Sequence, residues 1–233
     1  MSVRAPEPPP RGWARRPWRE VAFVSLDFEA TGLDLRRDEV VSFGVVPVSG
    51  GRVQSRGALY REVRPSRDPS HASIRIHNLR PGDLAAAATS ESALPTLSAA
   101  LDRRYLLAWA AEIEIAFLSG LFAGSRRAWR RRTIDVMRLA KAADGLDGTN
   151  PSSYALEAVA ARLDVPVDEP HHALDDALTT AQVFLVVAAR LARHDVATPG
   201  RLARTARRGK VSRTVVRSKP EAGPETGPEA GKV

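Results

Sequence analysis

The sequence predicts an α/β fold with a mixed sheet, and three observations carry this prediction. Two apolar runs rich in valine and phenylalanine, 21–28 and 40–48, are typical of buried strands. The pair Gly50-Gly51 then leads into an alternating segment, 52–63, which indicates an antiparallel hairpin. Further along, helical and strand-like segments alternate, as in helix-linked crossovers. We therefore expect a three-stranded meander followed by two crossover strands, a five-stranded sheet flanked by helices.

The elements after the meander follow in chain order. Leucine anchors indicate a mostly helical segment over 81–104, with Pro95 marking a break or a helix start inside it. The remaining apolar patterns and capping residues predict a strand at 105–110, a helix at 111–122, a strand at 133–139, a helix from Ser152-Ser153 to Leu163 and a long last helix over 171–193.

Composition divides the chain into three parts. Residues 1–17 contain five prolines and little apolar periodicity, so we expect a disordered leader. The folded domain is expected over 18–196. Residues 197–233 are first basic and then rich in Pro, Gly and Glu, which predicts a disordered tail.

The net charge of +8 lies at the two ends of the chain. Residues 1–20 hold five arginines and two acids, and residues 200–233 hold nine basic residues and three acids. The middle, 21–199, has 21 basic and 22 acidic residues. Basic ends are typical both of non-specific binding to nucleic acid and of solvated tails.

Several classes of protein are excluded. Cysteine is absent, which excludes a disulfide scaffold, a thiolate zinc site and a cysteine nucleophile. The best apolar stretch, 183–189, is far shorter than the ~18 residues that span a bilayer. The first residues lack the apolar core of a secretory signal. We therefore expect a cytoplasmic protein with no membrane partner.

The strongest local signal is a pair of acids at the end of the first strand. Asp27 and Glu29 are two residues apart, so their side chains share one face of the strand. Two like charges beside a core are unfavourable unless something offsets them, and hard divalent cations take carboxylate oxygens. Spacing alone leaves open a metal site or a frayed, solvated strand end.

The surrounding residues make this segment specific. Asp27-Phe28-Glu29-Ala30-Thr31-Gly32 resembles the Asp-x-Glu-x-Thr-Gly motif of the DnaQ-like, or DEDDh, 3′→5′ exonucleases, which include the DNA polymerase III epsilon subunit and RNase T. The resemblance implies an RNase H-like fold. It also implies that Asp27 and Glu29 are metal ligands, and that Thr31 and Gly32 turn the backbone beside the terminal nucleotide.

A second stretch near the end of the domain supports the same resemblance. His171-His172-Ala173-Leu174-Asp175-Asp176-Ala177 is similar to the family's His-x-Ala-x-x-Asp-Ala motif. The family spacing makes His171 the general base and Asp176 a metal ligand. His172 is the rival base, at the wrong distance from Asp176. Asp175 suits the start of a helix, where its charge meets the helix dipole.

The middle motif departs from the family, which usually shows His-Asn-Ala-x-Phe-Asp-x-x-Phe-Leu. Aligned on Phe117, this chain places Glu114 at the Asp position, with Trp109 and Ala110 where His-Asn would stand. Glu114 keeps the oxygens and adds one methylene, and an exposed helix acid is the alternative. Glu112 is a further candidate, about 200° around the helix.

Two smaller features bear on the substrate. Phe28, Leu33 and Phe117 are placed to stack or wedge at the terminal bases, or are simply core. The arginine-rich segment 126–132, between a helix and a strand, either contacts phosphates or is a solvated loop.

Together the resemblance implies a metal-dependent 3′→5′ exonuclease that releases nucleoside 5′-monophosphates. Two divalent cations, Mg²⁺ or Mn²⁺, would be held by the carboxylates of Asp27, Glu29, Glu114 and Asp176. The expected partners are a single-stranded 3′ end of DNA or RNA and a DNA polymerase or repair complex. Two alternatives stay open: a non-catalytic nucleic-acid or polymerase-binding module, and an exonuclease of short RNA.

Overall fold

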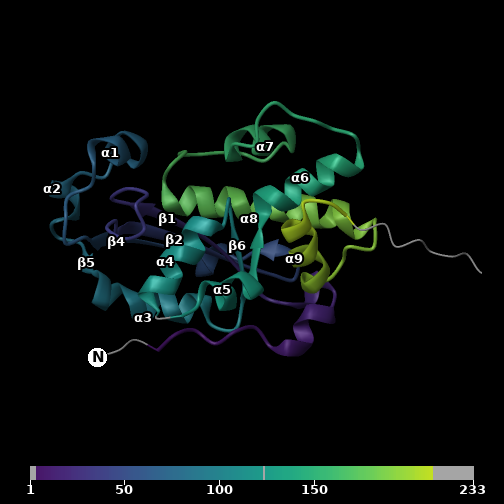
Figure 1. Ribbon diagram of the computed structural model, residues 1–233, viewed down its shortest axis with the longest axis horizontal. Coiled ribbons are helices and arrows are strands. Elements are labelled where there is room, and N and C mark those ends of the chain that lie inside the picture. Colours follow the sequence, from purple (N-terminus) through teal and green to yellow (C-terminus); the bar gives the residue numbers. More distant parts are fainter. Residues whose placement is uncertain (1–3, 123, 212–233) are drawn as a thin grey trace, which may run out of the picture.

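The computed structural model describes residues 4–122 and 124–211, which build a seven-stranded mixed sheet between two layers of helices (Figure 1). The hydrogen-bonded order of the strands is β5-β4-β2-β1-β6-β7, and β3 pairs with β2. The strands are β1 (Phe23–Ala30), β2 (Val40–Ser49), β3 (Arg52–Val53), β4 (Leu59–Arg64), β5 (Ala88–Thr89), β6 (Tyr105–Ala108) and β7 (Thr133–Asp135). The expected mixed α/β sheet is confirmed.

The pairing follows the predicted meander and crossovers. β1 pairs antiparallel with β2 and parallel with β6, which in turn pairs parallel with β7. The predicted third strand over 52–63 is split, because the short 3-10 helix η3 (Ser55–Gly57) interrupts it between β3 and β4. The two-residue strands β3 and β5 account for the difference from the five strands expected.

Nine α-helices occur in the described part of the chain. They are α1 (His71–His77), α2 (Pro81–Leu84), α3 (Ser90–Leu101), α4 (Glu112–Leu121), α5 (Arg126–Arg132), α6 (Val136–Leu146), α7 (Leu156–Arg162), α8 (Ala173–Ala192) and α9 (Pro199–Arg208). Pro95 lies inside α3, whereas the segment before α3 holds only the short α2 and β5. None of the described helices is both long and apolar enough to cross a bilayer.

The predicted strand over 133–139 is wrong after its third residue. The side chain of Asp135 accepts a hydrogen bond from the amide of Arg138 at 2.9 Å, which caps the N-terminus of α6. An N-terminal cap of this kind satisfies one of the free amides of the first turn. The apolar residues after Asp135 therefore continue as a helix, and the strand ends at the cap.

Alternation along β1 divides the core into two clusters, one on each face of the sheet. Val24, Leu26 and Phe28 belong to a cluster with residues of α3, α4 and α5. Phe23 belongs to the other cluster, with residues of α6, α7, α8 and α9. Because side chains alternate along a strand, Asp27 points to the same face as Phe23, toward α8.

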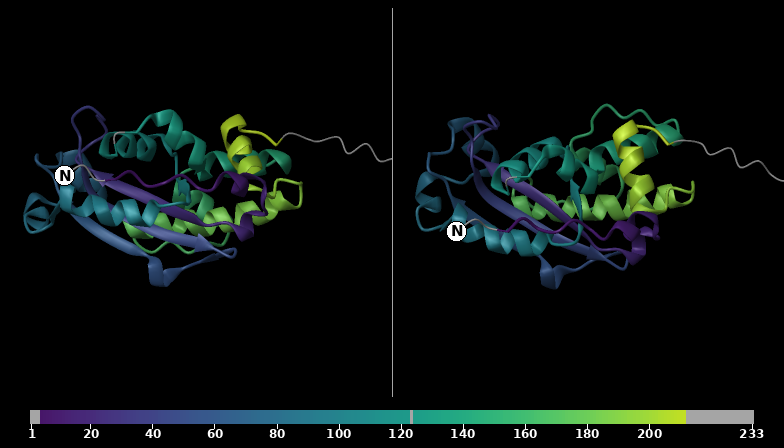
Figure 2. Two further views of the ribbon diagram at one scale, coloured as in Figure 1. Left: turned by 90° about the horizontal axis from the view of Figure 1, so that it is seen from below. Right: turned by 60° about the horizontal axis from the view of Figure 1, so that its bottom comes forward.

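Of the segment expected to be a disordered leader, residues 4–10 instead run along the domain, and the 3-10 helix η1 (Arg11–Arg15) follows them (Figure 2). The amide of Glu7 donates to Asp102 Oδ1 at 2.7 Å, and the amide of Arg103 donates to the carbonyl of Glu7 at 2.9 Å. Ser98 Oγ donates to the carbonyl of Arg4 at 2.7 Å. Backbone pairing of this kind compensates for the low apolar content on which the expectation of disorder rested.

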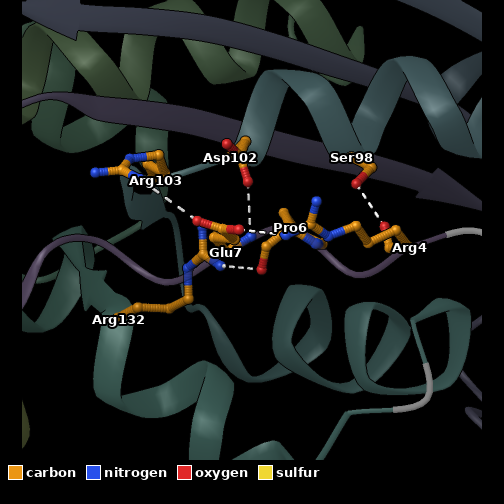
Figure 3. Close-up of polar contacts among 7 residues, drawn as sticks. All are labelled: Arg4, Pro6, Glu7, Ser98, Asp102, Arg103 and Arg132. Atoms are coloured by element: carbon orange, nitrogen blue, oxygen red, sulfur yellow. Dashed lines mark hydrogen bonds and ion pairs between the residues drawn. The ribbon is translucent and has the colours of Figure 1, made fainter.

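A buried arginine completes this contact (Figure 3). The Arg132 guanidinium donates to the carbonyl of Pro6 at 3.2 Å and to that of Arg104 at 3.0 Å, and also to the carbonyl of Leu101. Burial lowers the pKa of Arg132 to about 10. The arginine-rich segment 126–132 is therefore the helix α5 and not a solvated loop, and its last residue links Pro6 to Leu101 and Arg104.

The C-terminal part also differs from the expected tail. Residues 199–208 form α9, whose apolar residues Leu202, Ala203 and Ala206 recur at helical spacing and are buried against the core. The described fold thus extends beyond 18–196 at both ends. The Pro/Gly/Glu-rich part of the expected tail lies outside the described residues.

Candidate active site

The end of β1 and the start of α8 meet at one point of the fold. Asp27 lies opposite Gly44 in the β1–β2 register. A Cβ atom at Gly44 would stand 2.2 Å from the carbonyl oxygen of Ala173 and 2.4 Å from Cα of Leu174. Because Gly44 has no side chain, the first turn of α8 rests directly on β2. This close approach brings Asp176 beside the acids of β1.

Three carboxylates form a cluster here. Ligand atoms of Asp27, Glu29 and Asp176 all lie within 4.8 Å of one another. Burial and, to a smaller extent, the charge of Asp176 together raise the pKa of Glu29 to about 8. The pKa of Asp27 is raised by burial and by the neighbouring carboxylates of Glu114, Glu29 and Asp176. The pKa of Asp176 rises to about 6, again chiefly through burial.

Glu114 lines the same cleft from the first turn of α4, and only 4% of it is exposed. Its Oε2 atom is buried with no hydrogen-bond partner among the described residues. Burial raises the pKa of Glu114 to about 8, and the charges of Asp135 and Glu29 act in the same direction. Glu114 is therefore not the exposed helix acid of the alternative interpretation. Glu112 is that acid, because it lies on the surface bound to Arg130.

His171 stands at the entrance to α8 with a left-handed backbone, φ 63°. Its amide donates to Asp176 Oδ2 at 3.2 Å, and its side chain lines the same cleft as the acids. His172 is engaged elsewhere: its Nδ1 lies 2.7 Å from Asp175 Oδ2, and its ring packs on Tyr60 with centroids 4.4 Å apart. His172 and Asp175 thus anchor the turn that presents His171.

A cleft of about 610 Å³ opens above the carboxylates. Phe28, Gly32 and Leu33 line it, and Leu33 is 74% exposed. Thr31 is buried beneath the turn, where its hydroxyl donates to Asp38 Oδ1 at 2.9 Å. Phe117 packs edge-on against Phe28, with ring centroids 6.0 Å apart, and is core. The structure therefore does not bring Thr31 and Phe117 into the cleft with the other residues expected to contact substrate.

Three further residues lie at or beside the site. Trp109 lines the cleft as well as packing on the core. His77 is buried in α1 with Nε2 3.3 Å from the carbonyl of Ala30, and burial lowers its pKa. Asp135 raises the pKa of Glu114 from β7. None of the three was predicted from the sequence to be a ligand, a base or a substrate contact, because only the fold brings α1, β6 and β7 to the end of β1.

The donor set fits a hard divalent cation. It consists of carboxylate oxygens, which Mg²⁺ and Mn²⁺ prefer. Glu114 Oε2 and Asp176 Oδ1 are buried and have no hydrogen-bond partner in the described part of the chain. Buried polar atoms without a partner are costly, and a cation or a proton would satisfy these two. The raised pKa values have the same origin, since burial is the largest cause of the shift in each of these carboxylates.

Comparison with known proteins agrees with this geometry. The family model described as Exonuclease, RNase_T, matches residues 24–184. The PolC-type DNA polymerase III of Thermotoga maritima is 34% identical over 173 residues, which cover 71% of this chain and 12% of that protein. The DNA polymerase III epsilon subunit of Aquifex aeolicus is 25% identical over 167 residues, covering 71% of this chain and 79% of that protein.

Solved structures of exonuclease I share the fold. The structure of E. coli exonuclease I in complex with a dT13 oligonucleotide has a TM-score of 0.64 and 17% identity, and covers 75% of this chain and 42% of that chain. These structures have an RNase H-like fold, so the fold implied by the motifs is confirmed. The chain spans 12% of the length of its PolC-type relative. With its family match and motif residues in one cleft, the chain belongs to the DnaQ-like exonuclease family.

Proposed function

We propose that this chain is a metal-dependent 3′→5′ exonuclease that hydrolyses the terminal phosphodiester of a single strand and releases nucleoside 5′-monophosphates. The observation that carries the proposal is the carboxylate cluster in an open cleft. Ligand atoms of Asp27, Glu29 and Asp176 lie within 4.8 Å of one another, and the buried Glu114 borders the same cleft.

Asp27, Glu29, Glu114 and Asp176 would hold two divalent cations, Mg²⁺ or Mn²⁺. When bound, these supply an acidified water and stabilise charge at phosphorus and on the leaving 3′ oxygen. Without them, four carboxylates facing one cleft repel a phosphodiester. The chain should therefore hold a strand end in the cleft, and cut it, only in the presence of metal.

His171 is the proposed general base. A neutral imidazole accepts a proton near pH 7, and the left-handed backbone at His171 turns this residue into the cleft. Asp176 holds the His171 amide and so links the base to the carboxylate cluster. His172 is a poor substitute, because Asp175 already occupies its Nδ1 atom.

The apolar walls of the cleft are proposed to hold the terminal bases. Leu33, which follows β1, and Ile76 of α1 both line the cleft. Leu33 is 74% exposed and Ile76 is 54% exposed. Trp109 and Phe28 line the same space. Such side chains stack on or wedge between bases with little preference for sequence, which suits an enzyme that removes successive nucleotides.

A role in proofreading or repair, in the cytoplasm, belongs to the same proposal. It is supported by relatives described as a PolC-type polymerase III and a polymerase III epsilon subunit. The substrate is DNA on this reading, with short RNA as the alternative. A non-catalytic binding module is the second candidate, and the motif with Trp109 and Ala110 in place of His-Asn favours it.

The test is degradation of 3′- and 5′-labelled single-stranded DNA and RNA with Mg²⁺, Mn²⁺ or EDTA. Asp27→Asn removes a ligand charge with little change in shape. Asp164→Asn is the matched control, since Asp164 is exposed and its φ of 54° suits asparagine as well. We expect metal-dependent loss from the 3′ end that Asp27→Asn abolishes and Asp164→Asn retains. If the chain binds DNA or RNA but cleaves neither, the exonuclease proposal is wrong and the non-catalytic binding module takes its place.

A further inference from the structure

A second hollow, of about 250 Å³, lies behind the cleft and is ringed by arginines from three helices. Arg130 comes from α5, Arg138 from α6 and Arg207 from α9. A smaller hollow on the other side of α9 is lined by His194, Arg201, Arg204, Arg208 and Lys210. We call the residues Arg130, Arg138, Arg201, Arg204, Arg207, Arg208 and Lys210 the α9 basic surface. Figures 1 and 2 show α9 beside the helices of the middle of the chain.

The protein's own acids neutralise little of this surface. Glu112 is held by Arg130, whose Nε lies 3.1 Å from Glu112 Oε1. One carboxylate oxygen of Asp135 accepts the hydrogen bond that caps α6. Within residues 4–122 and 124–211, the guanidinium groups of Arg138 and Arg207 take part in no hydrogen bond or ion pair.

The two segments that contribute this surface are strongly basic. Segments 124–143 and 199–211 together hold twelve basic residues and one acid, a net charge of +11. The whole chain has a net charge of +8, so all other residues together carry −3. A concentration of this kind creates a local positive potential that attracts polyanions.

The first turn of α4 separates this surface from the cleft. Ile113 and Glu114 line the cleft, whereas Ala111, Glu112 and Ile115 line the larger basic hollow. Successive residues of one turn thus border both spaces. A strand whose end lies over Glu114 needs only to cross this turn to reach Arg130, Arg138 and Arg207.

We propose that the α9 basic surface binds the phosphate backbone of the nucleic-acid strand upstream of the nucleotides held in the cleft. The proposal rests on the proposed function, and it assigns α9 the role of retaining long substrates. Guanidinium forks match phosphate oxygens in geometry, and several of them spaced along a groove match successive phosphates.

A protein partner fits this surface less well. Protein interfaces need buried aromatic or aliphatic anchors at their centre. The large apolar side chains that are exposed in the described residues are Leu33, Leu35, Ile76 and Val186, and none of them lines either basic hollow. The chemistry offered is charge and hydrogen-bond donors, which is the chemistry that recognises a phosphodiester chain.

The experiment compares two double variants of the full chain. Arg138→Gln with Arg207→Gln removes two charges from the α9 basic surface. Arg52→Gln with Arg56→Gln removes two equally exposed charges from β3 and η3, outside it. The Kd for a 30-nucleotide single strand is measured in EDTA at several salt concentrations. In Mg²⁺, kcat/KM is measured for the same strand and for a dinucleotide.

We expect the Arg138/Arg207 variant to raise the Kd about tenfold or more at 0.1 M salt. The slope of log K against log salt should fall in magnitude by about 1.4, or 0.7 for each lost phosphate contact. Its kcat/KM should fall on the 30-nucleotide strand and change less than twofold on the dinucleotide. The Arg52/Arg56 variant should change the Kd and the slope much less.

Three results would overturn the proposal: equal effects of the two double variants on the Kd, an equal loss on the dinucleotide, or displacement of the strand by polyglutamate of the same charge as readily as by unlabelled strand. The third would identify a general polyanion surface. If the unsubstituted chain hydrolyses nothing, the proposed function fails, and the Kd in EDTA still decides this proposal on its own.

Discussion

Glu114 reaches the cleft in a different way from the acids of β1. It projects from a helix and carries one more methylene than the Asp of the family motif. Its carboxylate is nevertheless buried, with one oxygen lacking a partner in the described residues, and its pKa is raised to about 8. The longer side chain therefore still brings a buried carboxylate to the cleft that the acids of β1 line.

This geometry predicts the effect of shortening the side chain. Glu114→Asp should keep the activity within about threefold or raise it, because the donor oxygens and the charge remain. Glu114→Ala should abolish hydrolysis, since it removes a ligand. Steady-state rates in Mg²⁺ check both, with Glu112→Asp on the exposed face of α4 as control. A loss in Glu114→Asp as complete as in Glu114→Ala would mean that the extra methylene is built into the site.

Substitution of the two adjacent histidines should lower kcat to different extents. His171→Ala should lower kcat by roughly 10²–10⁴-fold, the range expected when a general base is removed. His172→Ala should lower kcat about tenfold or less, because it loosens the turn and leaves the base in place. Steady-state kcat of both variants in saturating Mg²⁺ measures the difference. A larger loss in His172→Ala than in His171→Ala would make His172 the base.

At the scale of the elements, the site depends on how closely α8 approaches the sheet. Gly44→Ala should destabilise the fold by ~1–3 kcal/mol or more and lower the activity, because the new Cβ meets the backbone of Ala173 and Leu174. It would displace the start of α8, and with it Asp176 and His171. Gly120→Ala, in α4 with nothing within 4 Å of the new Cβ, is the control. Unchanged activity and stability in Gly44→Ala would contradict this account.

One side chain of α5 links the N-terminal segment to the end of α3 and the start of β6. Arg132→Ala leaves the carbonyls of Pro6, Leu101 and Arg104 without their donor, so we expect a loss of about 2–4 kcal/mol in the free energy of unfolding. Arg131→Ala, the exposed neighbour, should cost less than about 0.5 kcal/mol. Urea unfolding of both variants measures the difference. Deletion of residues 1–8 should weaken the effect of Arg132→Ala, because one of the acceptors is then absent.

At the scale of the whole molecule, the sequence predicted what is local and missed what is long-range. The acids of β1 and the His171–Asp176 pair each lie within one short segment, so their resemblance to the family motifs was enough to single them out. Asp135 and His77 approach the site from other elements, and only the fold shows this. The polar composition of the N-terminal segment and of α9 predicted disorder, because backbone pairing and a narrow apolar face leave little trace in composition.

The buried carboxylates also set how the stability of the whole molecule depends on pH and metal. The folded pKa values of Glu29 and Glu114 are about 8, above the ordinary value of 4.5. A carboxyl group whose pKa is higher in the folded state than in the unfolded state stabilises the fold while its proton is bound. This contribution to stability is lost as the pH rises through the pKa of the folded state. Burial lowers the pKa of His77, so its contribution to stability grows as the pH rises. This opposite effect is confined to pH values near and below the ordinary pKa of 6.5.

Metal-free protein should therefore become less stable from pH 6.5 to pH 8.5, with a fall in Tm of roughly 5 °C. Mg²⁺ should reverse most of this fall at pH 8.5, since a cation stabilises the ionised carboxylates that the proton leaves behind. Glu114→Gln should flatten the pH dependence in EDTA and reduce the response to Mg²⁺. Thermal unfolding in EDTA and in Mg²⁺ at the two pH values measures these effects. A metal-free Tm that rises over this interval would mean that the cluster is already neutralised by the protein's own cations.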